Sequence, residues 1–102
     1  MKNITKADWE SDVVNGGLVL VDFWADWCRP CQMMMPVLEQ LENEVALLSV
    51  VKVNGDTETD LMTEFKIQGL PTMLLYKDGE LVWSLTGARP FASMVEKIAP
   101  YL

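Results

Sequence analysis

The stretch LVLVDFWADWCRPC, from Leu18 to Cys31, contains the two features that decide the fold. Its first half, Leu18–Trp24, is an almost uninterrupted run of apolar and β-branched residues, which predicts a central strand buried on both faces. Its second half contains Cys28 and Cys31, the only two cysteines of the chain. Two thiols this close can form a structural staple, half a metal site or a reactive dithiol.

The composition is that of an ordinary globular protein. The chain has 102 residues, of which 50% are hydrophobic and 23% are charged. This length favours one domain, residues 1–102, with a single core. The formal net charge is −7 and there is no histidine. A surface with this negative charge repels phosphate backbones, so we expect no nucleic-acid partner. Without histidine, the chain lacks the commonest metal ligand.

The sequence offers no targeting or membrane signal. The first residues, MKNITKADWE, lack the apolar core of a secretory signal. The apolar runs are far shorter than the ~20 residues that a membrane helix needs. We therefore expect a cytoplasmic protein with no membrane partner, and structural disulfides are rare in that compartment. A bridge across two residues would also constrain the unfolded chain very little, which counts against a staple.

Changes in hydrophobic period predict the remaining elements. Apolar residues recur every three or four positions between Cys31 and Val45, which indicates a helix. Asp78 and Gly79 predict a hairpin turn, so the last two strands should be antiparallel. The other expected elements are strands at Lys2–Ile4, Leu47–Val53, Thr72–Tyr76 and Leu81–Leu85, and helices after Thr5, at Glu58–Lys66 and at Phe91–Tyr101.

The order of these elements predicts a three-layer α/β fold. The strand–helix–strand unit from Leu18 to Val53 implies a right-handed parallel crossover. The hairpin adds an antiparallel edge. A mixed central sheet with helices on both faces follows.

Cys28 is expected where the central strand ends and the next helix begins. The first turn of a helix has free N–H groups and the positive end of the dipole, so a sulfur there is stabilised as thiolate. Pro30 is tolerated in that turn, where its missing N–H would have no partner. We expect Cys28 to be exposed enough to attack a disulfide, and the more buried Cys31 to resolve the mixed disulfide. The residues therefore favour thiol–disulfide exchange.

Two other interpretations of the cysteine pair stay open on the residues alone. A structural zinc ion needs four ligands, and this chain offers only two cysteines, so a metal site would have to be shared between two subunits. The other interpretation is a passive disulfide or two inert thiols.

The sequence around the cysteines resembles the thioredoxin family, whose motif is usually WCGPC. The similarity runs nearly end to end, through VDFWADWCRPC, Pro36, VVKVN, GLPTMLLYKDGE and the pair Gly87–Ala88. Arg29 stands where glycine is usual, and Gln32 stands where thioredoxins often have lysine. Glutaredoxins are a poorer match, because their motif is usually CPYC.

The resemblance implies roles for residues beyond the cysteines. Asp22 interrupts an apolar strand, so we expect it to be buried with a raised pKa rather than turned to solvent. Its family counterpart is a proton acceptor for the resolving cysteine. Lys52 matches a family lysine near this aspartate, although a lysine in a strand is often simply solvated. Pro71 matches a cis-proline that faces the dithiol, whereas most X–Pro bonds are trans.

The family also holds an extended target peptide through the backbone before this proline, a form of strand addition. The resemblance thus implies a flat, mostly apolar docking surface beside the dithiol. Trp24 is expected as core or scaffold, and of the Met33–Met35 run only Met33 is a candidate for the rim. The implied docking residues are Trp27, Arg29, Pro30, Leu70, Pro71, Gly87 and Ala88.

The resemblance implies a general protein disulfide reductase that cycles between dithiol and disulfide. Its partners would be disulfide-containing target proteins and a flavin-containing thioredoxin reductase. We expect a monomer without a bound cofactor, since the chain has no nucleotide-binding glycine pattern. One alternative is a more oxidising oxidoreductase or isomerase of the same fold, which the reduction potential would distinguish. Another is a redox-independent binding subunit, which would remain active after both cysteines are replaced by serine.

Overall fold

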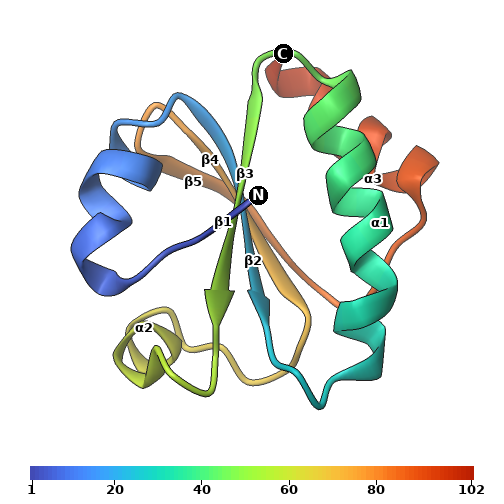
Figure 1. Cartoon of the computed structure of the whole chain (residues 1–102). Coiled ribbons are helices and arrows are strands. Elements are labelled where there is room, and N and C mark those ends of the chain that lie inside the picture. Colours follow the sequence, from blue (N-terminus) through green and yellow to red (C-terminus); the bar gives the residue numbers. More distant parts are fainter.

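The computed structural model describes all 102 residues and is built on one mixed five-stranded sheet (Figure 1). Its strand order is β1-β3-β2-β4-β5, so β2 is central. β1 and β2 both pair with β3 in parallel, whereas the β2–β4 and β4–β5 pairs are antiparallel. The strands are β1 (Lys2–Asn3), β2 (Leu18–Trp24), β3 (Leu48–Asn54), β4 (Thr72–Lys77) and β5 (Glu80–Thr86).

Helices cover both faces of this sheet, which confirms the predicted three-layer α/β fold. Figure 1 shows α1 (Arg29–Glu44) and α3 (Phe91–Ile98) on one face. α2 (Thr59–Glu64) and the helical turns Lys6–Asp8 and Glu10–Val14 lie on the other. No helix in the structure has both the length and the apolar character needed to span a membrane.

The alternation of side chains along β2 creates the two halves of the core. Leu18 and Leu20 pack in one buried cluster with α1 and α3, whereas Val19, Val21 and Phe23 pack in a second cluster with α2. A strand buried on both faces needs apolar residues at successive positions, which is why this stretch reads as a continuous apolar run.

Several of the predicted helices and strands extend too far. α1 ends at Glu44, and Val45 is already extended, so the expected helix stops one residue early. β3 begins at Leu48, and Leu47 is 75% exposed instead of lying in the strand. The expected final helix becomes a 3-10 turn after Ile98, at Ala99–Tyr101. Pro100 explains the change, because its nitrogen has no hydrogen to continue the α-helical pattern.

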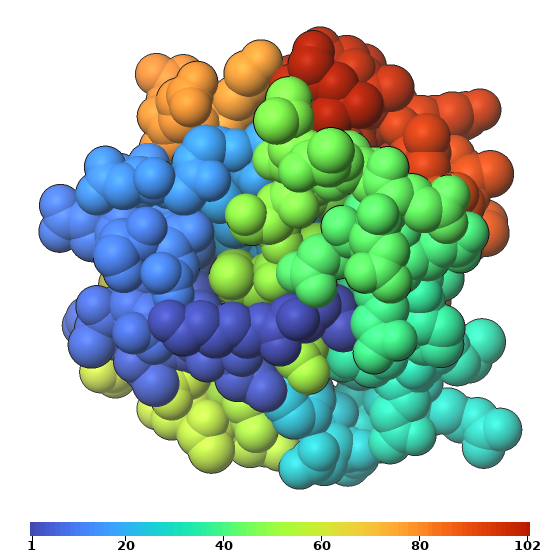
Figure 2. Space-filling view, turned by 45° about the horizontal axis from the view of Figure 1, so that its top comes forward, coloured from blue at the N-terminus to red at the C-terminus, as the bar shows by residue number.

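The N-terminal segment contacts α1 and then begins the first helical turn. Figure 2 shows it crossing the surface towards α1. The Met1 ammonium group lies 3.0 Å from the Glu42 carboxylate of α1. At the start of the first helical turn, the Thr5 backbone N–H donates a 2.9 Å hydrogen bond to the Asp8 carboxylate, which forms part of a capping box.

Candidate active site

The two cysteines form a disulfide at the start of α1. Cys28 is the N-cap residue of the helix, and its Sγ accepts a 3.2 Å hydrogen bond from the backbone N–H of Cys31. The two Cα atoms are 5.3 Å apart. The Cys28 sulfur therefore lies at the positive end of the α1 dipole, where negative charge is stabilised. The disulfide also occupies both thiols that a shared zinc site would require.

Both cysteines are largely covered in the disulfide form. Cys28 is 3% exposed and Cys31 is fully buried. The reason is that Ala25, Trp24 and Leu70 pack against the bridge and cover both sulfurs. Cys28 is still the more exposed of the two, so a partner can reach only that edge of the disulfide.

The loop before β4 closes one side of the disulfide. The Leu70–Pro71 peptide bond is cis, as the resemblance implied. Leu70 packs against the cysteine pair, and the Gly87 N–H donates a 2.8 Å hydrogen bond to the Pro71 carbonyl oxygen. Pro71 itself is buried, whereas we expected its ring to lie open on the docking surface. Its carbonyl bond to Gly87 explains this position, because it ties the loop to the end of β5.

Trp27 stands on the surface beside the disulfide. Its side chain is 71% exposed, and its indole N–H donates a 3.2 Å hydrogen bond to Asp56 Oδ1. Asp56 lies in the loop after β3 and is fixed in turn, because its backbone N–H donates to Asn54 Oδ1 at 2.9 Å. Sequence reasoning missed Asp56, and no local pattern pointed to it, since the contact spans 29 positions.

The remaining predicted docking residues surround the same site. Arg29 and Pro30 are exposed at the first turn of α1, and Ala88 is exposed just after β5. Gly87 is half-buried and has a φ of +100°, which favours glycine. The structure thus brings together residues from α1, the loop before β4 and the end of β5.

Asp22 is a buried carboxylic acid in the middle of β2. It is fully buried, and neither of its carboxylate oxygens accepts a hydrogen bond from the protein. Burial raises its pKa from the ordinary 3.8 to about 7, while the positive charge of Lys52 acts in the lowering direction. Alternation along the strand places Asp22 on the same face as Leu20, which packs against α1.

Lys52 lies next to Asp22 in the sheet but forms no ion pair with it. The two residues are partners in the parallel register of β2 and β3, so their side chains project from the same face. The Lys52 ammonium group lies 5.3 Å from the centre of the Trp24 ring, a cation–π distance. Lys52 therefore acts on Asp22 through its charge rather than through a hydrogen bond.

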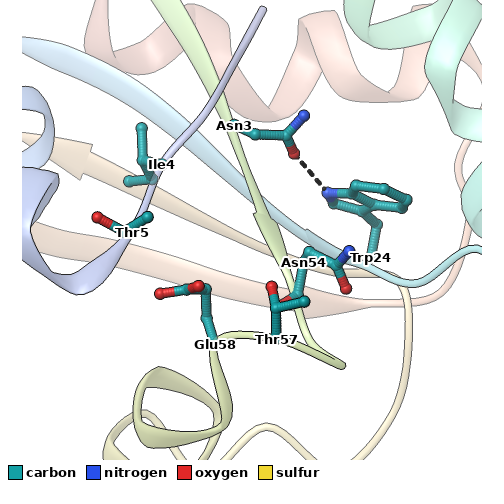
Figure 3. A pocket seen from close by; sticks show the side chains of 7 residues that line it. All are labelled: Asn3, Ile4, Thr5, Trp24, Asn54, Thr57 and Glu58. Atoms are coloured by element: carbon teal, nitrogen blue, oxygen red, sulfur yellow. Dashed lines mark hydrogen bonds between the residues drawn. The ribbon is translucent and has the colours of Figure 1, made fainter.

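Trp24 serves as a scaffold between the disulfide and the sheet edge. Figure 3 shows its indole N–H directed at the side-chain oxygen of Asn3, and that hydrogen bond measures 3.0 Å. The half-buried ring packs against the disulfide cluster. A cavity of about 270 Å³ adjoins it, lined by Asn3, Ile4, Thr5, Trp24, Asn54, Thr57 and Glu58.

Replacing Lys52 by methionine should raise the pKa of Asp22 further above 7. Lys52 supplies the positive charge that lowers this pKa, and methionine keeps a similar length without the charge. Titration of the Asp22 carboxyl by NMR measures the change. Lys77→Met is the matched control, because Lys77 is exposed at the far end of β4. An unchanged Asp22 pKa in Lys52→Met would show that the two residues do not interact.

A disulfide at a helix N-terminus, bordered by a cis-proline loop, defines a thiol–disulfide oxidoreductase. Comparison with known proteins agrees with this class. The thioredoxin family model matches residues 1–100. A thioredoxin of Listeria monocytogenes is 41% identical over 103 aligned residues, which cover all of this chain and 99% of that protein. Thioredoxins of Mycobacterium bovis, at 39% identity over 94% of this chain and 84% of the relative, and of Pyropia yezoensis, at 36% over 100% and 97%, are also similar.

The chain belongs to the thioredoxin family. It is a protein disulfide oxidoreductase that works through the Cys28–Cys31 dithiol–disulfide pair.

Proposed function

We propose that the protein is a general disulfide reductase in which Cys28 attacks and Cys31 resolves. The observation that carries this proposal is the place of the Cys28 Sγ at the N-cap of α1, where it accepts the Cys31 N–H. In the reduced protein this sulfur is favoured as a thiolate. The thiolate bonds to one sulfur of a target disulfide, the target S–S bond breaks, and the other target sulfur leaves as a thiolate.

The second step returns the protein to its disulfide form. The Cys31 thiol gives up its proton, and its sulfur attacks the Cys28 sulfur of the mixed disulfide. The second target thiolate leaves, so two electrons have passed from the dithiol to the target. We infer that the Asp22 carboxylate accepts the Cys31 proton. A pKa of about 7 suits this role, because an acid–base group works best near the ambient pH. Lys52 keeps part of the Asp22 population ionised.

Target docking is assigned to the surface around the disulfide. An extended target segment would pair with the backbone at Leu70, next to the cis bond, in the manner of an added strand. The exposed Trp27 ring offers apolar contact area on one side, and Ala88 offers it on the other. Arg29, Pro30 and Gly87 complete the proposed surface, and the buried Pro71 contributes the cis bond beside it.

The source of electrons is proposed to be a flavin-containing thioredoxin reductase. The protein would then act in the cytoplasm, as a single-domain monomer, in electron transport to disulfide-containing target proteins. The support for this setting is the family itself and the thioredoxin relatives that align over the whole chain.

Insulin reduction with NADPH and a thioredoxin reductase tests the proposal. Turnover of NADPH that depends on this protein is the expected result. Reduction by dithiothreitol but by no thioredoxin reductase would exclude the proposed donor. If neither donor supports reduction, the binding-subunit alternative is favoured, and it is tested by the biological activity of the variant with both cysteines replaced by serine.

Arg29→Gly should make the protein a slightly stronger reductant. The exposed guanidinium lies between the two cysteines in sequence and stabilises the thiolate, and therefore the reduced form. An exposed ion pair contributes roughly 0.3–1 kcal/mol, which corresponds to about 6–20 mV for two electrons. Redox equilibration against glutathione measures the shift, which should shrink as salt rises. An unchanged potential at low salt would leave Arg29 with a recognition role at most.

A further inference from the structure

A groove beside the disulfide has no role in the exchange chemistry described above. It has a volume of about 330 Å³ and is lined by Met33, Met34, Val37, Ala88, Arg89 and Pro90. Four of these six residues are hydrophobic. Met33 is 65% exposed, so most of its apolar side chain is open to a partner. The groove is large enough for one or two apolar side chains, at the lower end of the range for ligand sites.

The groove is continuous with the redox site. Met34 lies three residues after Cys31, about one helical turn along α1. The connection between β5 and α3 runs beside this half of α1 (Figure 1), and the Arg89 N–H donates to the Met34 sulfur at 3.2 Å. On the other side, a Cβ added to Gly87 would come within 2.9 Å of Arg89 Nη1, so the guanidinium lies against Gly87. A target that contacts Gly87 therefore meets Arg89 next.

The charge of the groove is opposite to that of the protein. The chain has a net charge of −7, yet no acidic side chain lines the groove. Arg29 and Arg89 are the only arginines of the chain, and they lie beside the disulfide and in the groove. Arg89 forms no ion pair with any acidic residue, and its side chain donates only to the Ala88 carbonyl oxygen at 3.2 Å. Its charge is thus available to a partner.

We propose that this groove selects target proteins in which an apolar side chain and a carboxylate lie next to the reducible disulfide. The apolar side chain enters between Met33 and Val37, and the carboxylate pairs with Arg89. This inference rests on the proposed function, because it gives that same site a preference among its targets.

The test uses short peptides whose single cysteine is joined by a disulfide to 2-mercaptoethanol. The first peptide has one Leu and one Glu on each side of its cysteine. The second has Lys in place of both Glu residues, and the third has Ser in place of both Leu residues. The rate of reduction by the dithiol protein is measured for each. Bis(2-hydroxyethyl) disulfide serves as a substrate that is too small to use the groove.

The wild-type protein should reduce the Leu–Glu peptide about two- to fivefold faster than the Leu–Lys peptide, the range that an exposed ion pair supports. It should reduce it about tenfold faster than the Ser–Glu peptide, the range typical of a lost apolar contact. Arg89→Glu should reverse the first preference and keep the second. Met33→Ser should weaken the second preference and keep the first.

Lys77→Glu makes the same charge change at the far end of β4 and should leave both preferences as in the wild type. Equal preferences in Arg89→Glu and the wild type would overturn the groove proposal. So would equal wild-type rates for all three peptides together with normal reduction of the small disulfide. Failure to reduce any substrate, the small disulfide included, would instead overturn the proposed function on which the groove rests.

Discussion

Replacing Cys28 by serine is expected to lower disulfide reduction below about 1% of the wild-type rate, because a hydroxyl group cannot form the mixed disulfide. The loss should come from chemistry rather than from unfolding. Serine is a favoured N-cap residue, so it can satisfy the start of α1 that Cys28 now caps.

Insulin reduction with dithiothreitol as donor measures this loss, and urea unfolding of the reduced proteins checks that the fold is retained. Glu39→Ser is the matched control, since it changes an exposed side chain on the same helix without removing a thiol. It should reduce insulin through an intact dithiol. Wild-type turnover by Cys28→Ser would refute the assignment of Cys28 as the attacking residue.

Asp22→Asn is expected to stabilise the protein at neutral and alkaline pH. The pKa of Asp22 is raised in the folded protein, from 3.8 to about 7, so folding favours its protonated form. As the pH rises from about 4 to 7, the wild type therefore loses stability, and the loss is complete above pH 7. A difference of about three pKa units corresponds to about 4 kcal/mol. Asparagine does not ionise, so the variant escapes this loss.

Urea unfolding of the oxidised proteins at pH 4.5 and at pH 8 measures the effect. The variant should lie within about 1 kcal/mol of the wild type at the lower pH and be about 2–4 kcal/mol more stable at the higher pH. Glu39→Gln is the matched control, because Glu39 is exposed on α1 and its loss should give no such pH dependence. A variant less stable than the wild type at pH 8 would show that Asp22 does not carry a buried charge.

The same variant tests the proposed proton transfer. Without the carboxylate, disulfide exchange at pH 7 should slow by about one to two orders of magnitude but not stop, since solvent can still accept the proton. The wild-type rate should depend on a group with a pKa of about 7, and this dependence should vanish in Asp22→Asn. An unchanged rate and pH profile would leave Asp22 with a purely structural effect.

Local sequence patterns were sufficient to predict the fold. The apolar run of β2 identified the central strand, and the Asp78–Gly79 turn identified the hairpin, where both residues have positive φ. These signals are local, because each depends on neighbouring residues in the chain. The buried Asp22 was also predictable, since a single carboxyl within an apolar run has no exposed position in a strand covered on both faces.

The contacts that shape the site could not be predicted in this way. Three hydrogen bonds near the site join residues that are far apart in the sequence. They are Trp27 to Asp56, Trp24 to Asn3, and the Arg89 N–H to the Met34 sulfur. The burial of Cys28 in the disulfide form also depends on a distant segment, because Leu70 packs against it from the loop before β4. The residue types at a helix terminus predict that a sulfur lies there, but they do not predict which distant side chains pack over it.

The most direct test of the central claim is to isolate the intermediate. The Cys31→Ser variant retains the attacking thiol and lacks the resolving one, so exposure to an oxidised target protein should yield a stable mixed disulfide. Mass spectrometry of the trapped complex should place the link at Cys28, and dithiothreitol should release the target. If Cys31→Ser forms no adduct while the wild type reduces the same target, exchange through Cys28 with resolution by Cys31 is contradicted.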